Sequence, residues 1–395
     1  MVGRWWSSLA VGARDGRNVN LRPLPDRSAN LPRAWVAAWA ALLWISAPLL
    51  PALRNYLNEN AAGGFNRYVA VGLLAAAAVI VASTWLVASG RRWRAVGTLI
   101  LLGVGFALVY FLLAAPDPRS RVVEAAHFVQ YGTLACLAFF SLRGLSLIAR
   151  SAQTLLLVVA VGLVDELIQW VLATRVAEIR DVAVNAAAGA FGLLYAGFVL
   201  KEGGAKRGEL VWPTRAELRD VAISGALVLP VLGAFMYFVH MGDWIRWNNV
   251  EFVSQYRAEG LDRTGEERRM RWSSMSGISE SQRERLLRPA EDLWGIEDFY
   301  VTEARRHIQA RNQAADAGDA HAATGENQIV ERWYTPYIEI AGARRTDLPK
   351  DLAGAYRSNV LAHLWPWLAS PSVWGAFIAA EMALVGLALR LESSL

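Results

Sequence analysis

The chain is poor in cysteine, in lysine and in charge. Cys136 is the sole cysteine among 395 residues, so no intramolecular disulfide can form and cysteine usage does not identify the redox compartment. Lysine occurs only at positions 201, 206 and 350, and charged residues make up 19% of the sequence. The basic residues are scattered between apolar runs and form no single face, so we expect no nucleic-acid partner.

The sequence is instead rich in long apolar runs. Hydrophobic residues make up 54% of the chain, and runs of about 20 apolar residues are long enough to cross a bilayer. We therefore predict an all-α, polytopic bundle of about eight transmembrane helices. The first of them is the least regular, because Pro48 and Pro51 interrupt it. The expected helices are residues 34–53, 68–89, 95–115, 122–142, 152–172, 181–200, 221–241 and 373–391.

Arginine and lysine set the expected orientation. They concentrate in the first 33 residues and in every second loop after them, and such loops stay in the cytoplasm. Both termini are then cytoplasmic and the long insertion lies outside. The abundant arginine and alanine suggest a GC-rich bacterial genome, hence a bacterial cytoplasmic (inner) membrane. The predicted parts are a basic cytoplasmic arm (1–33), two N-terminal transmembrane helices (34–94), a four-helix module (95–200), a cytoplasmic loop with the seventh helix (201–241), an extracytoplasmic cap (242–371), and the eighth helix with its tail (372–395).

The insertion between the last two helices is predicted to be mainly helical. Helix-forming residues fill 296–315, whereas the Ala, Gly, Asp and Asn content of 315–325 predicts a mobile loop. Tryptophans near both membrane exits, at 244–247 and 365–367, are typical of an interfacial aromatic belt. The insertion has enough aromatic residues for a small folded cap, which is a candidate docking surface for a protein partner.

Three successive helices of the module carry polar residues at helical spacing. Positions three and four apart lie on one side of a helix, and ionisable groups in a bilayer are costly unless they face a bundle interior or a wet cavity. The topology places His127 and Glu166 on the order of 9 Å below the outer surface, and Asp181 and Asn185 begin the sixth helix from the same side. We therefore predict one polar cluster in the outer leaflet, made of Glu124, His127, Tyr131, Asp165, Glu166, Gln169, Asp181 and Asn185.

The ordered pattern of these residues resembles the VanZ-like membrane proteins over about residues 95–200. The elements that carry the resemblance are His127-Phe128 with Tyr131, Glu166 with Gln169, Arg175, and Asp181 with Asn185 followed by small residues. Two positions depart from the family pattern: its Asp-Lys pair before the histidine is Val123-Glu124 here, and its glycine after the asparagine is Ala188.

The resemblance implies a role near lipid-linked precursors of the cell envelope. The founding member is associated with resistance to teicoplanin, a lipidated glycopeptide that binds cell-wall precursors outside the membrane. No established reaction comes with the family, so the resemblance implies a site without assigning a chemistry to it. The gain of Glu124 in place of a lysine reverses local charge and weakens the expectation of an anionic ligand.

Three interpretations of the cluster stay open. In the first, an outward-facing pocket binds a lipid headgroup or lipid-linked precursor. In the second, an enzyme acts on a lipid phosphate, with Glu166 or Asp165 as general base, His127 as its partner and Arg175 as a phosphate clamp. In the third, the cluster only joins helices in a subunit of a larger assembly that docks through the cap. The residues assigned to binding are Glu124, Tyr131, Gln169, Arg175, Asp181 and Asn185.

Two plainer expectations accompany these interpretations. Arg175 and Arg180, in the loop between the fifth and sixth helices, suit interfacial side chains that extend toward lipid headgroups. No close His/Glu spacing supports a metal site, and no sequence feature points to a cofactor, so we expect neither.

Overall fold

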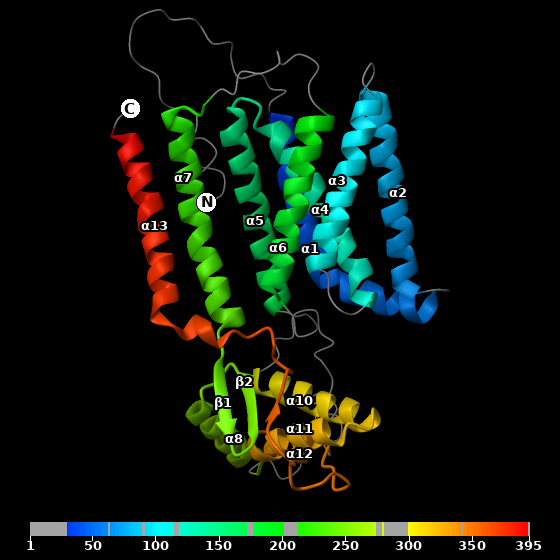
Figure 1. Cartoon of the computed structure of the whole chain (residues 1–395), viewed down its shortest axis with the longest axis vertical. Coiled ribbons are helices and arrows are strands. Elements are labelled where there is room, and N and C mark those ends of the chain that lie inside the picture. Colours follow the sequence, from blue (N-terminus) through cyan, green and yellow to red (C-terminus); the bar gives the residue numbers. More distant parts are fainter. Residues whose placement is uncertain are drawn as a thin grey trace, which may run out of the picture.

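Figure 1 shows long helices standing side by side, with a smaller domain of strands and short helices at one end of the bundle. The computed structural model describes residues 30–61, 64–88, 92–113, 118–171, 177–200, 212–273, 279, 299–341 and 343–393. We call the smaller domain, which lies between α7 and α13 in sequence, the cap. The bundle helices are α1 (Asn30–Asn60), α2 (Gly64–Val87), α3 (Arg92–Leu113), α4 (Pro118–Ser141), α5 (Leu147–Val171), α6 (Ile179–Leu194), α7 (Arg215–Phe235) and α13 (Pro371–Glu392).

Seven helices in the described part of the chain are long and apolar enough to cross a membrane: α1, α2, α3, α5, α6, α7 and α13. This confirms the prediction of an all-α, multi-pass membrane bundle. The eighth expected span, α4, is not among these seven. It nevertheless packs against α1, α5 and α6 inside the bundle. Single π-helical turns extend α6 (Tyr195–Val199) and α7 (Met236–His240).

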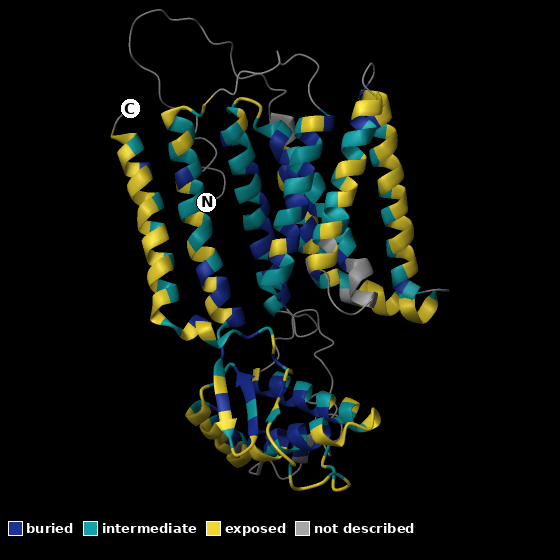
Figure 2. Cartoon of the chain, viewed as in Figure 1, coloured by how far each residue is buried: buried dark blue, intermediate teal, exposed yellow. Residues whose placement is uncertain are grey.

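Burial is uneven across the bundle. The inner helices α4, α5 and α6 bury many of their side chains, whereas α2, α3 and α13 expose apolar side chains around much of their surface (Figure 2). Exposed leucine and valine on outer helices suit contact with lipid tails. α1 begins and α13 ends at the end of the bundle far from the cap (Figure 1).

The first helix is more closely integrated with the four-helix module than its place in an N-terminal extension suggested. α1 continues through Pro48 and Pro51 to Asn60, and its residues Arg33–Leu50 have the apolar character of a span. The indole nitrogen of Trp39 donates to the carbonyl oxygen of Gln130 at 2.9 Å, and that of Trp44 donates to Val161 at 3.1 Å. These bonds tie α1 directly to α4 and α5.

Glycines allow α4, α5 and α6 to approach closely. A Cβ added to Gly192 of α6 would lie 2.3 Å from the carbonyl oxygen of Gly132 in α4. A Cβ on Gly189 would lie 2.7 Å from a methyl group of Val158 in α5. Because lipid gives little hydrophobic force between helices, close backbone packing is a main source of their association. The small residues after Asn185 therefore hold the three site-bearing helices together.

The cap contains a three-stranded sheet. β1 (Asp243–Trp247) and β2 (Val250–Ser254) form an antiparallel hairpin in which Trp247 pairs with Val250. Asn248, in the two-residue turn, has a φ of 48°, a conformation that asparagine tolerates better than most residues. β3 (Tyr356–Arg357) returns to pair in parallel with β2.

Short helices cover this sheet and complete an apolar core. They are α8 (Ala258–Ser273), α10 (Phe299–Asp316), α11 (Ala320–Trp333) and α12 (Thr335–Ala341), with a 3-10 turn at Pro366–Ala369 before α13. The large buried side chains of the core include Phe252, Tyr300, Ile329 and Tyr334. α10 agrees with the helix predicted over 296–315.

The prediction of a loop over 315–325 is wrong. Only a short turn separates α10 from α11, which begins at Ala320. Asp319 caps the new helix, because its carboxylate accepts from the backbone N–H of Ala322 at 3.0 Å. Gly325 is a packing residue within the helix, since an added Cβ would lie 2.2 Å from the ring of Tyr356.

Two buried carboxylates of the cap are saturated with hydrogen bonds. Glu303 accepts from the hydroxyl of Tyr334 at 2.7 Å, and burial raises the pKa of this carboxyl. Glu326 pairs with the Nδ1 nitrogen of His307 at 2.7 Å and accepts from the hydroxyl of Tyr356 at 2.7 Å. Buried polar groups with partners favour one arrangement of the domain, so we regard this network as part of the cap's structure.

Candidate functional site

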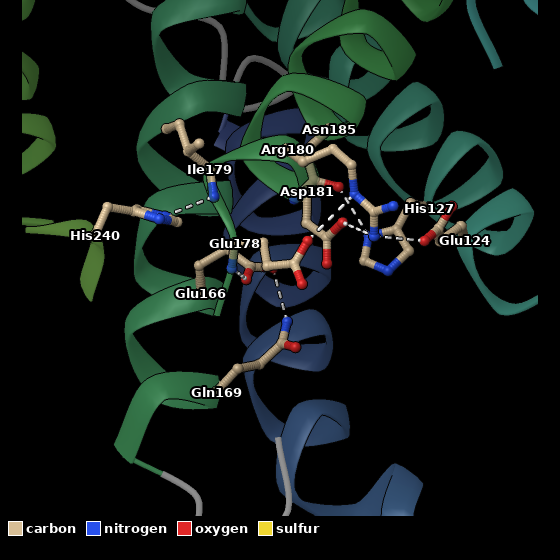
Figure 3. Close-up of polar contacts among 10 residues, drawn as sticks. All are labelled: Glu124, His127, Glu166, Gln169, Glu178, Ile179, Arg180, Asp181, Asn185 and His240. Carbon is tan, nitrogen blue, oxygen red and sulfur yellow. Dashed lines mark hydrogen bonds and ion pairs between the residues drawn. The ribbon is translucent and has the colours of Figure 1, made fainter. Parts of the chain in front are cut away.

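Polar side chains of α4, α5 and α6 meet near the end of the bundle that faces the cap (Figures 1 and 3). α4 contributes Glu124 and His127, and the last turns of α5 contribute Glu166 and Gln169. The first turns of α6 bring in Asp181 and Asn185 from the opposite direction. The structure thus brings together the eight residues that the sequence assigned to one cluster, and Arg175 lies outside the described residues.

Arg180 connects three carboxylates at the start of α6. Its guanidinium donates to Glu124 Oε1 at 2.8 Å and to Asp181 Oδ1 at 3.4 Å, and its Nε lies 3.3 Å from Glu178 Oε2. Its side chain is 30% exposed, so it sits at the edge of the cluster. The expectation that Arg180 simply extends toward headgroups missed these contacts, because helical spacing does not reveal ion pairs between α4 and the first turn of α6.

His127 belongs to a second group, formed by α4 and α6. Its Nδ1 nitrogen lies 2.8 Å from Asn185 Oδ1, which requires the proton on Nδ1. The imidazole also stacks on Tyr131, with 5.9 Å between ring centres. Asn185 is fully buried, and its amide nitrogen has no hydrogen-bond partner within the described residues. That amide lies against Gly162 of α5, where an added Cβ would come within 3.2 Å of it.

The third group is centred on α5. The hydroxyl of Tyr131 donates to Asp165 Oδ2 at 3.0 Å. Gln169 donates to the same oxygen at 3.3 Å and to Glu166 Oε1 at 2.9 Å. The other oxygen of Glu166 accepts from the backbone N–H of Glu178 at 3.1 Å. Glu166 therefore links α5 to the residue that precedes α6, and both of its oxygens act as acceptors.

His240 is the contact that sequence reasoning missed altogether. This residue ends the π-helical turn after α7 and is 1% exposed. Its Nε2 accepts from the backbone N–H of Ile179 at 2.9 Å, so it reaches the start of α6 from the side opposite Arg180 (Figure 3). The only available signal was a histidine at the cap-side end of the seventh span, since nothing in its spacing pairs it with α6.

Acceptors dominate the chemistry of the cluster. Three carboxylates, those of Glu124, Glu178 and Asp181, face the guanidinium of Arg180. Two more, those of Asp165 and Glu166, accept from Gln169. Burial is the main cause that raises the pKa of Glu178, helped by Asp181 and Glu124 and opposed by Arg180. No group of three His, Cys, Asp or Glu side chains in the described ranges is placed to hold a metal ion. The site thus suits a ligand that brings hydrogen-bond donors.

The predicted acid–base pair is not arranged as the enzyme interpretation expects. His127 bonds Asn185 rather than a carboxylate, Asp165 bonds Tyr131, and Glu166 bonds Gln169 and the Glu178 amide. A general base normally lies within hydrogen-bond reach of its partner. The geometry therefore favours holding helices and a ligand over proton transfer between these two groups.

The fold and the polar cluster together define a multi-pass membrane helix bundle with a buried polar site beside a folded cap. Within that class, residues 73–200 match the VanZ/LLP1 family, which supports a VanZ-like assignment for this part of the chain. The match begins within α2, earlier than the expected start near residue 95, and ends after α6. Searches of curated proteins and of solved structures each returned no significant match.

Proposed function

We propose that this protein binds the polar head of a membrane lipid, or of a lipid-linked envelope precursor, at the cluster formed by α4, α5 and α6. The membrane would be the bacterial cytoplasmic membrane, with both termini in the cytoplasm and the cap outside. The observation that carries the proposal is the convergence of buried acceptors and one partly exposed guanidinium, Arg180, at the cap-side end of the bundle. A polar group inside a bilayer is a candidate functional site by default.

The contacts of Arg180 restrict the class of headgroup that can bind. Its guanidinium already faces Glu124, Glu178 and Asp181, so a phosphate would have to replace a carboxylate there. A headgroup with hydroxyl or amino groups would instead donate to these acceptors while its phosphate approaches the open edge of the guanidinium. Arg175 remains the expected second phosphate contact.

The test is native mass spectrometry of protein extracted gently from its own membrane. We expect a phosphate-containing lipid to be retained by the unaltered protein and lost in Arg180→Ala and in Arg175→Ala. Arg94→Ala is a matched control, because Arg94 is exposed near the start of α3, at the far end of the bundle from the cap. Equal lipid retention in Arg94→Ala and Arg180→Ala would contradict a site at the cluster.

A second candidate is a subunit of a larger membrane assembly. It is favoured by Glu381, near the middle of α13, whose buried Oε2 has no hydrogen-bond partner in the described part of the chain. α13 packs on α7 and leaves most of its other faces exposed, so a helix from another protein could pack against it and change the surroundings of this carboxyl. In the same mass spectra, other chains retained at fixed stoichiometry and lost in Glu381→Leu would support this role.

A further inference from the structure

The N-cap residue of α6 makes no capping hydrogen bond with its side chain. The first amides of a helix have no partner within the helix and need an outside acceptor. Glu178 occupies the N-cap position in an extended conformation, with φ −136° and ψ 135°, but its side chain makes no cap hydrogen bond. The N–H of Ile179, the first residue of α6, donates instead to the imidazole of His240 at 2.9 Å. A side chain of the π-helical turn after α7 thus caps α6.

The imidazole of His240 also contacts the cap domain. Its Nδ1 lies 2.7 Å from the backbone carbonyl oxygen of His363. The carbonyl of His240 accepts from the N–H of Trp365 at 2.6 Å, and the two rings stack with 5.0 Å between centres. His240 therefore joins α6, the end of α7 and the segment of the cap that leads into α13.

These two partners fix the protonation of His240. A carbonyl oxygen only accepts and a backbone N–H only donates, so Nδ1 must carry the proton and Nε2 must offer a lone pair. A doubly protonated ring would present a donor to the Ile179 donor. It would also place a positive charge at the helix N-terminus, where the backbone dipole is itself positive. Only the neutral ring can make both contacts.

We infer that His240 is a positioning residue for the polar cluster, and that its neutral imidazole couples the cap to the start of α6. This inference rests on the proposed lipid-binding function of the same site. The first turn of α6 carries Arg180 and Asp181, whose side chains set the edge of the cluster. When His240 takes up a proton, the Ile179 contact is lost, the first turn of α6 is released and lipid binding weakens.

Other titratable groups near His240 have separate behaviour. From the cap, the ring of His363 lies 6.3 Å from that of His240, and burial, with Arg306 nearby, lowers its pKa to about 3. His363 therefore stays neutral in mildly acidic solution. From the start of α6, Glu178 faces Arg180 through its side chain. Phe235 of α7 and Trp365 complete the ring's aromatic surroundings without adding a titratable group.

The inference is tested first without any ligand, by hydrogen–deuterium exchange of the full-length protein. His240→Phe keeps an aromatic ring but provides neither contact. We expect faster exchange at the start of α6 and around Trp365 together in this variant, and in the unaltered protein when the pH is lowered from about 8 to about 5, after correction for intrinsic rates. His240→Gln, which retains a donor and an acceptor but does not titrate, should protect both segments at both pH values. Unchanged exchange in His240→Phe would overturn the inference.

The second arm measures binding in nanodiscs. The probes are phosphatidylethanolamine, phosphatidylglycerol and a polyprenyl phosphate, each diluted into phosphatidylcholine. For the probe that binds, His240→Phe should weaken binding roughly tenfold, which corresponds to about 1.4 kcal/mol, the size of a lost helix-capping contact. His240→Gln should remove the loss of binding at low pH, whereas His363→Gln, which keeps the backbone carbonyl, should retain it.

The two arms separate the two ideas. If exchange changes as expected but none of the probes binds the unaltered protein, the lipid-binding proposal fails while the coupling by His240 stands. If a probe binds and His240→Phe binds it as tightly as the unaltered protein with the same pH dependence, the positioning role is refuted and the lipid-binding proposal stands.

Discussion

Replacing Gly192 with alanine should force α4 and α6 apart. The added Cβ would lie 2.3 Å from the carbonyl oxygen of Gly132 and 2.7 Å from its Cα. Both atoms belong to backbone, so no side-chain rotation relieves the overlap. The helices would have to separate by about 1 Å to reach ordinary contact, and overpacking of this kind usually costs about 1–3 kcal/mol.

The same displacement should reach the polar cluster. Gly192 lies two turns beyond Asn185 on α6, and Gly132 follows His127 on α4 by just over one turn. Moving these helices apart stretches the 2.8 Å contact between His127 and Asn185. Gly192→Ala should therefore reduce both stability and lipid retention, without altering any polar residue.

Gly197→Ala is the matched control. It lies in the π-helical turn that follows α6, and an added Cβ would meet nothing within 4 Å. We expect its free energy of unfolding in SDS titrations to stay within about 0.5 kcal/mol of the unaltered protein. If Gly192→Ala unfolds at the same SDS concentration as Gly197→Ala, the close contact of α4 and α6 described above is refuted.

Three further predictions concern charge and protonation. Glu166→Gln should destabilise the protein by about 1–3 kcal/mol in SDS titrations. Both carboxylate oxygens of Glu166 accept hydrogen bonds, so the NH2 group of a glutamine would face the amide of Gln169 or the backbone N–H of Glu178, each of which is itself a donor. Burial lowers the pKa of His363 to about 3 in the folded protein. As the pH decreases from about 6.5 to about 5, the unfolded chain takes up a proton at this residue and the folded protein does not, so the free energy of unfolding should decrease by up to about 2 kcal/mol. Thermal unfolding of His363→Gln should lack this acid dependence. Glu124→Lys and Arg180→Glu should each lower stability, and the double variant should recover about 1 kcal/mol of coupling in a double-mutant cycle.

The helical period was sufficient to predict which polar residues of α4, α5 and α6 share a face. Spacing of three and four residues reports side-chain direction. Because the bilayer core offers no water for hydrogen bonding, polar side chains there face the interior of the bundle. Glu124, His127, Glu166 and Asn185 therefore converge as predicted. Their individual partners were not predictable, because pairing across helices depends on how closely the backbones approach, and Gly132 and Gly192 set that distance.

Contacts between distant segments account for most of what the sequence did not reveal. The Ile179 amide and His240 are 61 residues apart, and Trp44 bonds a carbonyl 117 residues away. Neither contact leaves a local pattern. The loop wrongly predicted before α11 has a different cause: composition suggested flexibility, whereas the Asp319 cap and the packing of Gly325 on Tyr356 stabilise a helix there.

Glu124 and Arg180 change how the departure from the VanZ-like pattern should be interpreted. The family pattern has a lysine before the histidine of the fourth helix, and this chain has Glu124 there. A loss of the cation would leave a purely acidic site, which repels phosphate. The structure instead places the guanidinium of Arg180, from the start of α6, 2.8 Å from the Glu124 carboxylate. Positive charge therefore remains beside α4 but is carried by the helix whose first turn His240 caps, so whatever moves α6 also moves the cation that we expect to meet a lipid phosphate.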